Sequence, residues 1–199
     1  MQTKEKLFIG YRNLANYITL LGLIFALLSC YFALTQNMRL CVTALILSAI
    51  CDLFDGAVAK KLQRTDNEKE FGIQLDTIVD VISFGITPII IAFCAISSDW
   101  YALIIYAFYA ICAVIRLAYY NTTVSSDTPV KHYRGLPVTC IAFVLPVILF
   151  IHPVAINITI LALTGIFFIT NVKIPKLRGM WSFIFSAIAI ALIALWWII

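Results

Sequence analysis

Charged side chains are scarce in this sequence. Asp, Glu, Lys and Arg make up 12% of its 199 residues, whereas apolar residues make up 63%. Soluble domains carry roughly one-quarter charged and one-half apolar residues, so a soluble globular domain is excluded. Because a membrane-spanning helix needs about 20 mostly apolar residues, the chain has room for about six to eight such helices and no separate soluble domain. We predict a single membrane-embedded domain over residues 1–199.

The sequence also lacks paired cysteines, internal repeats and low-complexity segments. Its six cysteines stand singly in or beside apolar stretches, and none forms a Cys-x-x-Cys pair. Isolated cysteines of this kind are typical of small buried apolar side chains. Zinc sites built on cysteine and structural disulfides are therefore not expected.

Long apolar stretches are what the sequence has in abundance, and they predict an all-α, polytopic transmembrane bundle of about seven spans. The stretches are Tyr17–Leu34, Leu40–Phe54, Ile78–Ile96, Tyr101–Ala118, Leu136–Ile151, Val154–Ile169 and Met180–Ile199.

The basic residues are divided unequally between the connecting segments. Cytoplasmic loops carry an excess of Lys and Arg. One set of alternate segments holds Lys4, Lys6, Arg12, Lys60, Lys61, Arg64, Lys69, Lys131, Arg134, Lys173, Lys176 and Arg178, and the other holds Arg39. We therefore expect an inner-membrane protein whose N-terminus and residues 60–71 are cytoplasmic and whose C-terminus lies on the far side.

Four aspartates stand in or beside the apolar stretches. Asp52 and Asp55 end the second stretch, and Asp76 and Asp80 begin the third. An aspartate at the centre of a spanning helix costs roughly 2.5–3.5 kcal/mol, so the group needs compensating positive charge. Helical spacing places each pair on one stripe, and an antiparallel return would bring the two stripes together. Converging carboxylates of this kind are ligands for one or two Mg²⁺ or Mn²⁺ ions. The alternative is that they cap helices or lie in solvent at the membrane surface.

The spacing of these aspartates resembles a known signature. The motif DxxDGxxAR…GxxxDxxxD of the CDP-alcohol phosphatidyltransferases is similar to Asp52-x-x-Asp55-Gly56-x-x-Ala59-Lys60 followed by Gly72-x-x-x-Asp76-x-x-x-Asp80. Lys60 stands where the family has arginine, so the positive charge is kept but the guanidinium fork is lost. The segment before Gly72 is about three residues longer than the motif usually has, and we expect its extra polar residues to bulge into the cytoplasm.

Segments further along the chain resemble one branch of that family, the phosphatidylserine synthases. Phe71–Pro88 is similar to their FGxxLDSLxDxxSFGxxP, Arg116–Asn121 to their RLARFN, and Gly135–Pro137 to their GLP. Where that branch often has a second proline, this chain has Thr139. The resemblance runs roughly from Asn16 to Pro137, so the later helices rest on hydrophobicity alone.

The resemblance implies a fold and a reaction. The fold is a bundle with a six-helix catalytic core, and the reaction transfers the phosphatidyl group of CDP-diacylglycerol to the hydroxyl of L-serine, giving phosphatidylserine and CMP. The resemblance implies Asp52, Asp55 and Asp76 as principal metal ligands, with Asp80 beside the metals as general base. It places Gly56, Ala59, Lys60 and Gly72 around the cytidine and the pyrophosphate. It also implies a homodimer.

Three further residues are candidates for substrate binding. Arg116 is a basic residue inside an apolar stretch, and intramembrane charges usually line a cavity, so it is a candidate partner for a phosphate or the serine carboxylate. Its alternative role is to extend toward the membrane surface. Asn16 and Thr19 resemble the Asn-x-x-Thr of the family's first helix, although the same residues could cap or link helices.

Other functions stay open at this point. Acceptor choice depends on pocket shape, so glycerol 3-phosphate, an inositol phosphate or a lipid could replace serine in the same chemistry. A cation transporter is the alternative from another class, but transporter sites lie near the membrane midplane between repeats, and here the acids lie at one end and no repeat is visible. The basic cytoplasmic side suits membrane lipid headgroups and not nucleic acid.

Overall fold

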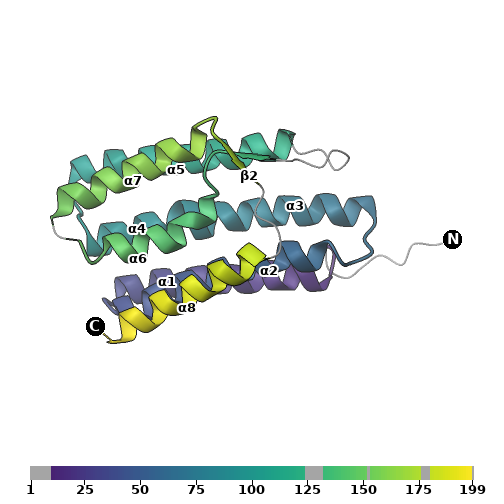
Figure 1. Cartoon of the computed structure of the whole chain (residues 1–199), viewed down its shortest axis with the longest axis horizontal. Helices are drawn as coiled ribbons and strands as arrows, with labels where there is room; N and C mark the ends of the chain where they lie inside the picture. The colour runs from purple at the N-terminus through teal and green to yellow at the C-terminus, as the bar shows by residue number, and fades with distance from the viewer. Residues whose placement is uncertain (1–9, 124–131, 152, 176–179, 199) are drawn as a thin grey trace.

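The described part of the chain is a bundle of helices in three rows that run along one long axis (Figure 1). A computed structural model describes residues 10–123, 132–151, 153–175 and 180–198. One outer row holds α1 (Leu14–Leu34), α2 (Met38–Ala59) and α8 (Met180–Ile198). The central row holds α3 (Asp66–Asp80), η1 (Val81–Ile86), α4 (Thr87–Ala95), η2 (Val138–Cys140) and α6 (Ile141–Ile148). The other outer row holds α5 (Trp100–Thr123) and α7 (Val154–Ile169).

The predicted all-α, multi-pass bundle is confirmed. Because α3, η1 and α4 form one continuous helical segment and η2 leads directly into α6, the described residues form seven helical segments, one for each predicted stretch. Four of them are long and apolar enough to cross a membrane, namely residues 14–34, 38–59, 66–95 and 100–122. The segment at Val138–Ile148 is shorter than the predicted Leu136–Ile151 and has Pro146 inside it.

The third helix begins earlier than the sequence analysis expected. It starts at Asp66, not Ile78, so residues 66–71 continue the helix and do not bulge as a loop. The cause is a capping box: Thr65 Oγ1 accepts from the Glu68 N–H, and the Glu68 carboxylate accepts from the Thr65 N–H. Asp76 and Asp80 therefore lie in the second half of α3, after a polar first half.

A short β-ribbon was not predicted. β1 (His132–Arg134) pairs antiparallel with β2 (Lys173–Pro175), and this pairing joins the connection before α6 to the connection before α8. The ribbon is too small to change the all-α class. It brings together two of the basic segments on which the predicted orientation depends.

Close packing of α1 against α2 positions the first two aspartates. A methyl group at Gly22 would lie 3.2 Å from Cys51 Cβ, so the two helices touch at a point where only glycine fits easily. The Ser48 hydroxyl donates to the Gly22 carbonyl at 2.9 Å, and Ser29 donates to the Cys41 carbonyl at 2.8 Å. These contacts hold the antiparallel helices together from the end of α1 to its middle, and so fix the course of α2 toward Asp52 and Asp55.

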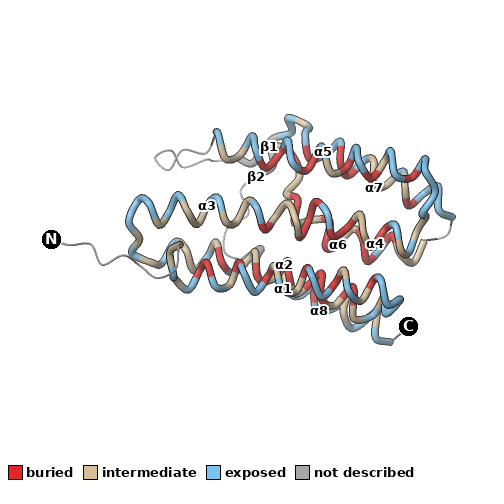
Figure 2. The backbone as a smooth tube through the Cα atoms, turned by 180° about the vertical axis from the view of Figure 1, so that it is seen from behind, coloured by how far each residue is buried: buried red, intermediate tan, exposed pale blue. Residues whose placement is uncertain are grey.

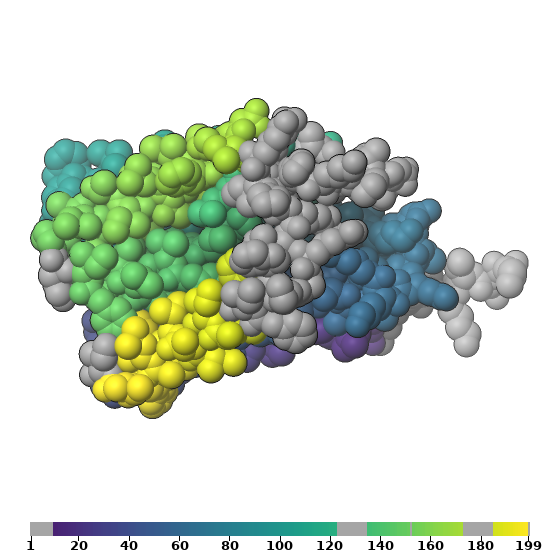
Figure 3. Space-filling model, in the orientation of Figure 1, coloured from purple at the N-terminus to yellow at the C-terminus, as the bar shows by residue number. Residues whose placement is uncertain are grey.

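The surface of the bundle is largely apolar. Buried residues gather where the three rows overlap, whereas the first half of α3 is exposed or half-buried (Figure 2). On one face α6 lies between α8 and α7 (Figure 3). Exposed apolar side chains follow the outer helices, as a lipid-facing surface requires; examples are Leu20, Leu27, Ile104 and Ile111.

Candidate active site

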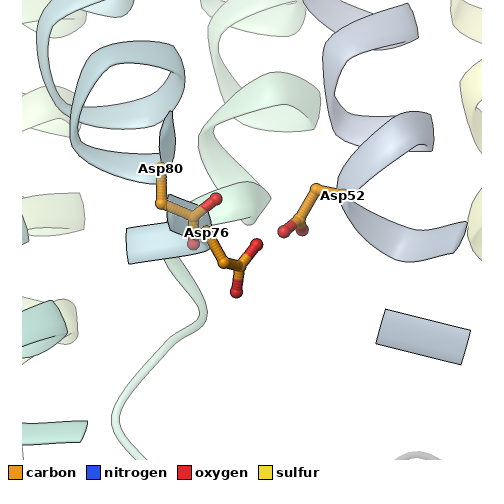
Figure 4. A group of neighbouring side chains, drawn as sticks. All are labelled: Asp52, Asp76 and Asp80. Atoms are coloured by element: carbon orange, nitrogen blue, oxygen red, sulfur yellow. The ribbon is translucent and has the colours of Figure 1, made fainter. Parts of the chain in front are cut away.

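Three carboxylates meet between α2 and α3. Asp52 projects from α2, and Asp76 and Asp80 project from successive turns of α3 (Figure 4). One oxygen from each lies within 4.8 Å of the others. All three side chains are half-buried. Helical spacing predicted that the aspartates of the two helices would face each other, and the structure brings three of the four together.

Asp55 lies beside this cluster but is engaged elsewhere. It is 5% exposed, and its Oδ2 accepts a 2.6 Å hydrogen bond from the Thr19 hydroxyl. Thr19 therefore joins α1 to the acidic end of α2. Asp55 and the cluster line one small cavity, whose walls are Thr19, Gly22, Ser48, Asp52, Asp55, Asp76, Val79, Asp80, Ser83 and Phe84.

The oxygen donors of the cluster fit a hard divalent cation. Mg²⁺ and Mn²⁺ prefer carboxylate oxygens, and several carboxylates gathered in an apolar bundle need positive charge beside them. The guanidinium of Arg116 acts electrostatically on Asp52. A single guanidinium does not balance four carboxylates, so the donor set matches a site for metal.

A π-helical turn follows Asp80. In η1 the Thr87 N–H bonds to the Ile82 carbonyl five residues back, and the buried Tyr109 hydroxyl donates to the Phe84 carbonyl at 2.6 Å. Such insertions are frequent at functional sites. Ser83 lies in this turn, is 1% exposed and lines the cavity, and its hydroxyl has no hydrogen-bond partner among the described residues.

Sequence reasoning missed the role of Thr139. This residue lies in η2, 87 positions after Asp52, and its hydroxyl donates to Asp52 Oδ2 at 2.8 Å. A proline at this position would have no hydroxyl to offer. The signal in the sequence was the departure from the second proline, but only the fold shows which carboxylate the threonine contacts.

We expect Thr139→Val to lower the affinity for the metal ion, and so to raise the metal concentration needed, without abolishing activity. Partners that orient a metal ligand are typically worth about 10–100-fold in metal affinity. Thr139→Ser keeps the hydroxyl and should behave like the wild type. The half-saturating Mn²⁺ concentration of each variant checks this. An identical value for Thr139→Val and Thr139→Ser would show that the hydrogen bond does not position Asp52.

The residues that the family resemblance places around the cytidine and pyrophosphate lie at the C-terminal end of α2 and on α3. A methyl group at Gly56 would meet no atom within 4 Å, so there is open space beside this turn. Ala59 is the last residue of α2 and is half-buried, whereas Lys60 caps the helix and is exposed. Gly72 lies on α3, one turn before Asp76, where a methyl group would lie 3.3 Å from Asn16 Oδ1.

Arg116 and Asn16 are both buried. Arg116, on α5, is 8% exposed, and its guanidinium carbon lies 4.7 Å from the ring centroid of Tyr120. Thr77 on α3 donates to the Asn121 side chain of α5 at 2.9 Å, which fixes this end of α5 beside the acidic helix. Asn16 donates to the Tyr11 carbonyl at 2.8 Å, so it holds the segment that leads into α1.

The fold and the site together define a class: a multi-pass membrane protein with a carboxylate cluster between two adjacent helices. Residues 12–198 match the sequence profile of the CDP-alcohol phosphatidyltransferase family. The chain belongs to this family. The match extends through α8, beyond the Asn16–Pro137 segment on which the motif resemblance rested.

Several relatives share one name, CDP-diacylglycerol–serine O-phosphatidyltransferase. The protein of Methanocaldococcus jannaschii is 32% identical over 165 residues, which cover 82% of this chain and 74% of that protein. The protein of Saccharomyces cerevisiae is 35% identical over 67% of this chain and 52% of its own length. The protein of Mycobacterium tuberculosis is 30% identical over 60% of this chain, and the match spans 41% of that longer protein.

Proposed function

We propose that this protein transfers the phosphatidyl group of CDP-diacylglycerol to the hydroxyl of L-serine, giving phosphatidylserine and CMP. The observation that carries the proposal is the convergence of Asp52, Asp76 and Asp80, at the signature spacing of the family, in one cavity. The shared name of the relatives supports serine as the acceptor.

In this reaction one phosphorus–oxygen bond replaces another. The serine hydroxyl oxygen attacks the phosphorus that carries the diacylglycerol, the bond from that phosphorus to the CMP oxygen breaks, and CMP leaves. The hydroxyl proton must go to a base, and the charge on the phosphates must be neutralised. The acyl chains can stay in the bilayer, since the helices around the site have apolar outer surfaces.

Asp52, Asp55 and Asp76 would be the principal ligands of one or two divalent ions, with Asp80 beside the ions. The ions, Mg²⁺ or Mn²⁺, would neutralise phosphate charge and hold the reacting groups in line. Thr19 and Thr139 each donate to one carboxylate, so they orient Asp55 and Asp52.

Asp80 is the residue we assign as general base. It lies on α3 one turn beyond Asp76, at the inner end of the cavity where Ser83 and Phe84 continue the wall. A carboxylate here can accept the serine hydroxyl proton as the new bond forms. The open space beside Gly56, at the opposite end of the acidic stripe, is where we place the cytidine and pyrophosphate, with Ala59, Lys60 and Gly72 around them.

Acceptor identity is tested by a panel of alcohols. Purified protein is incubated with CDP-diacylglycerol, Mn²⁺ and one of L-serine, glycerol 3-phosphate, an inositol phosphate or water alone, and CMP release is measured. We expect L-serine to give the fastest release. Faster release with another alcohol would support phosphatidyl transfer but show that this alcohol, and not serine, is the acceptor. No release with any of them would refute the proposed function.

We expect Arg116→Ala to raise the KM for serine or for the donor at least about tenfold, because losing a charge-assisted contact costs about 1.5–3 kcal/mol. The burial of Arg116 supports a role inside the bundle over extension to the membrane surface. Arg39→Ala, on the other side of the membrane, is the matched control. Unchanged kinetics in Arg116→Ala would show that this side chain binds neither substrate.

We also propose the orientation that the basic segments predict, in an inner membrane with the active site cytoplasmic. Figure 1 places the start of α1 and the end of α8 at opposite ends of the bundle, as an odd number of passes requires. Several of the basic residues, including Lys4, Lys6, Lys131 and Arg178, lie outside the described residues.

Reporter fusions should find residues 60–65 inside the cell and the C-terminus outside. Each reporter is active on one side of the membrane only, so fusions at both points give independent answers. A cytoplasmic C-terminus would show that one of the shorter helices, Val138–Ile148 or Val154–Ile169, does not cross the membrane.

The resemblance to the family is the basis for proposing a homodimer. Native mass spectrometry of the protein in lipid nanodiscs measures the number of chains directly. Two chains per particle are expected, and a single active chain would refute this part of the proposal.

A further inference from the structure

Arg64 lies in the connection between α2 and α3, and its guanidinium faces the active-site side of α3. The side chain is half-buried. A methyl group at Gly72 would lie 3.1 Å from one terminal nitrogen of Arg64 and 3.3 Å from Asn16 Oδ1. The guanidinium therefore occupies the space that a side chain at position 72 would need, between the starts of α1 and α3.

No protein group among the described residues balances this cation. Arg64 forms none of the ion pairs or hydrogen bonds found there, and its Nε is buried without a hydrogen-bond partner. A buried N–H donor that lacks a partner destabilises the fold, because it has lost its hydrogen bonds to water. An arrangement of this kind is favourable when an anion binds and completes it.

The position of Arg64 relative to the carboxylates fits a phosphate of the donor. Gly72, which Arg64 contacts, is one helical turn before Asp76, so the two points lie about 5–6 Å apart along α3. Asn16, on the other side of the guanidinium, is nearly one turn before Thr19, which donates to Asp55. The guanidinium thus lies about one helical turn from residues that line the acidic cavity, on the side of the α2–α3 connection.

Lys60, at the position of the signature arginine, has a different setting. It is exposed, it caps the end of α2, and it lacks the fork that binds two phosphate oxygens at once. The chain between Lys60 and Gly72 is also longer than the signature usually has. Four residues after Lys60, Arg64 supplies the guanidinium that position 60 lacks.

We propose that Arg64 binds the pyrophosphate of CDP-diacylglycerol and performs the anion-binding role of the arginine missing from position 60. The proposal rests on the function proposed above, because it takes CDP-diacylglycerol as the donor. The proposal also explains why a glycine is needed at position 72, because the absence of a side chain there leaves room for the guanidinium beside the site.

The test compares donor binding and turnover in four proteins: the wild type, Arg64→Ala, Lys60→Ala and the double variant Arg64→Ala/Lys60→Arg. Donor affinity is measured by titrating CDP-diacylglycerol into detergent-solubilised protein with Mg²⁺ and no acceptor. Loss of a charge-assisted bidentate contact should lower the affinity of Arg64→Ala at least about tenfold. Lys60→Ala should lower the affinity by less than Arg64→Ala does, since Lys60 is exposed and an exposed charge contributes little.

The double variant separates a phosphate-binding role from a structural one. If the guanidinium itself is what the donor needs, Lys60→Arg should restore most of the affinity lost in Arg64→Ala. A double variant no better than Arg64→Ala, an unchanged affinity in Arg64→Ala, or a larger loss in Lys60→Ala would each overturn the assignment. Because binding is measured without turnover, a wild type that binds the donor but transfers nothing to serine would refute the proposed function and leave the Arg64 comparison intact.

Discussion

Replacing Asp80 with asparagine should lower turnover by about 10²–10⁴-fold while donor affinity changes by no more than about threefold, because a general base contributes to the rate and an amide cannot accept the serine proton. Asp80 is the member of the cluster next to the π-helical turn, at the inner end of the cavity. Its replacement should leave the metal and the donor bound by the remaining carboxylates.

Asp52→Asn is the matched comparison. A neutral amide is a poorer ligand for a hard divalent ion, so this variant should lose metal and donor affinity together. CDP-diacylglycerol affinity and turnover are measured side by side for both variants. Equal loss of donor affinity in the two variants would show that Asp80 acts mainly as a metal ligand and would leave the general base unassigned. Full turnover in Asp80→Asn would show that Asp80 has no part in the mechanism.

Removal of divalent metal should reduce CMP release to the background rate. The cluster presents carboxylates to the donor phosphates, and without added cations the like charges repel. Added Mg²⁺ or Mn²⁺ should restore the rate, and chelator already saturated with Mg²⁺ is the control for effects of the chelator itself. Undiminished release in excess free chelator would exclude metal-assisted chemistry at this site.

Local patterns in the sequence predicted the helices well. Long apolar stretches are a direct consequence of the bilayer, so seven helical segments could be placed by hydropathy alone. The start of α3 was missed because hydropathy does not register a polar first half, although the Thr65-x-x-Glu68 capping box was present in the sequence. A helix start that is set by capping hydrogen bonds is predicted from the capping residues and not from hydropathy.

The site was predictable where its residues follow helical spacing. Asp76 and Asp80 lie one turn apart on one helix, so their common face followed from the sequence, and an antiparallel return brought Asp52 to them. Contacts between distant segments could not be predicted in this way. The hydrogen bond from Thr139 to Asp52 and the placement of Arg64 beside Gly72 depend on how several helices pack.

The turn after Asp80 shows a second limit of local patterns. A π-helical turn shifts the register of the residues that follow, and the Tyr109 hydroxyl that bonds to its Phe84 carbonyl comes from 25 positions away. Helical periodicity puts Ser83 on the same face as Asp76 and Asp80, but it does not show that the hydroxyl lines a cavity there. Only the folded chain shows that this hydroxyl, three residues after the proposed base, has no hydrogen-bond partner among the described residues.

The most direct measurement follows isotopically labelled L-serine into lipid. Wild-type protein in vesicles that contain CDP-diacylglycerol is given Mn²⁺ and labelled serine, and a protein with both Asp52→Asn and Asp76→Asn serves as the control. We expect labelled phosphatidylserine to form with one CMP released for each lipid made, and no label in the lipid of the control. Folded, metal-loaded wild-type protein that incorporates no serine, or a control that incorporates as much as the wild type, would contradict phosphatidyl transfer to serine at this carboxylate cluster.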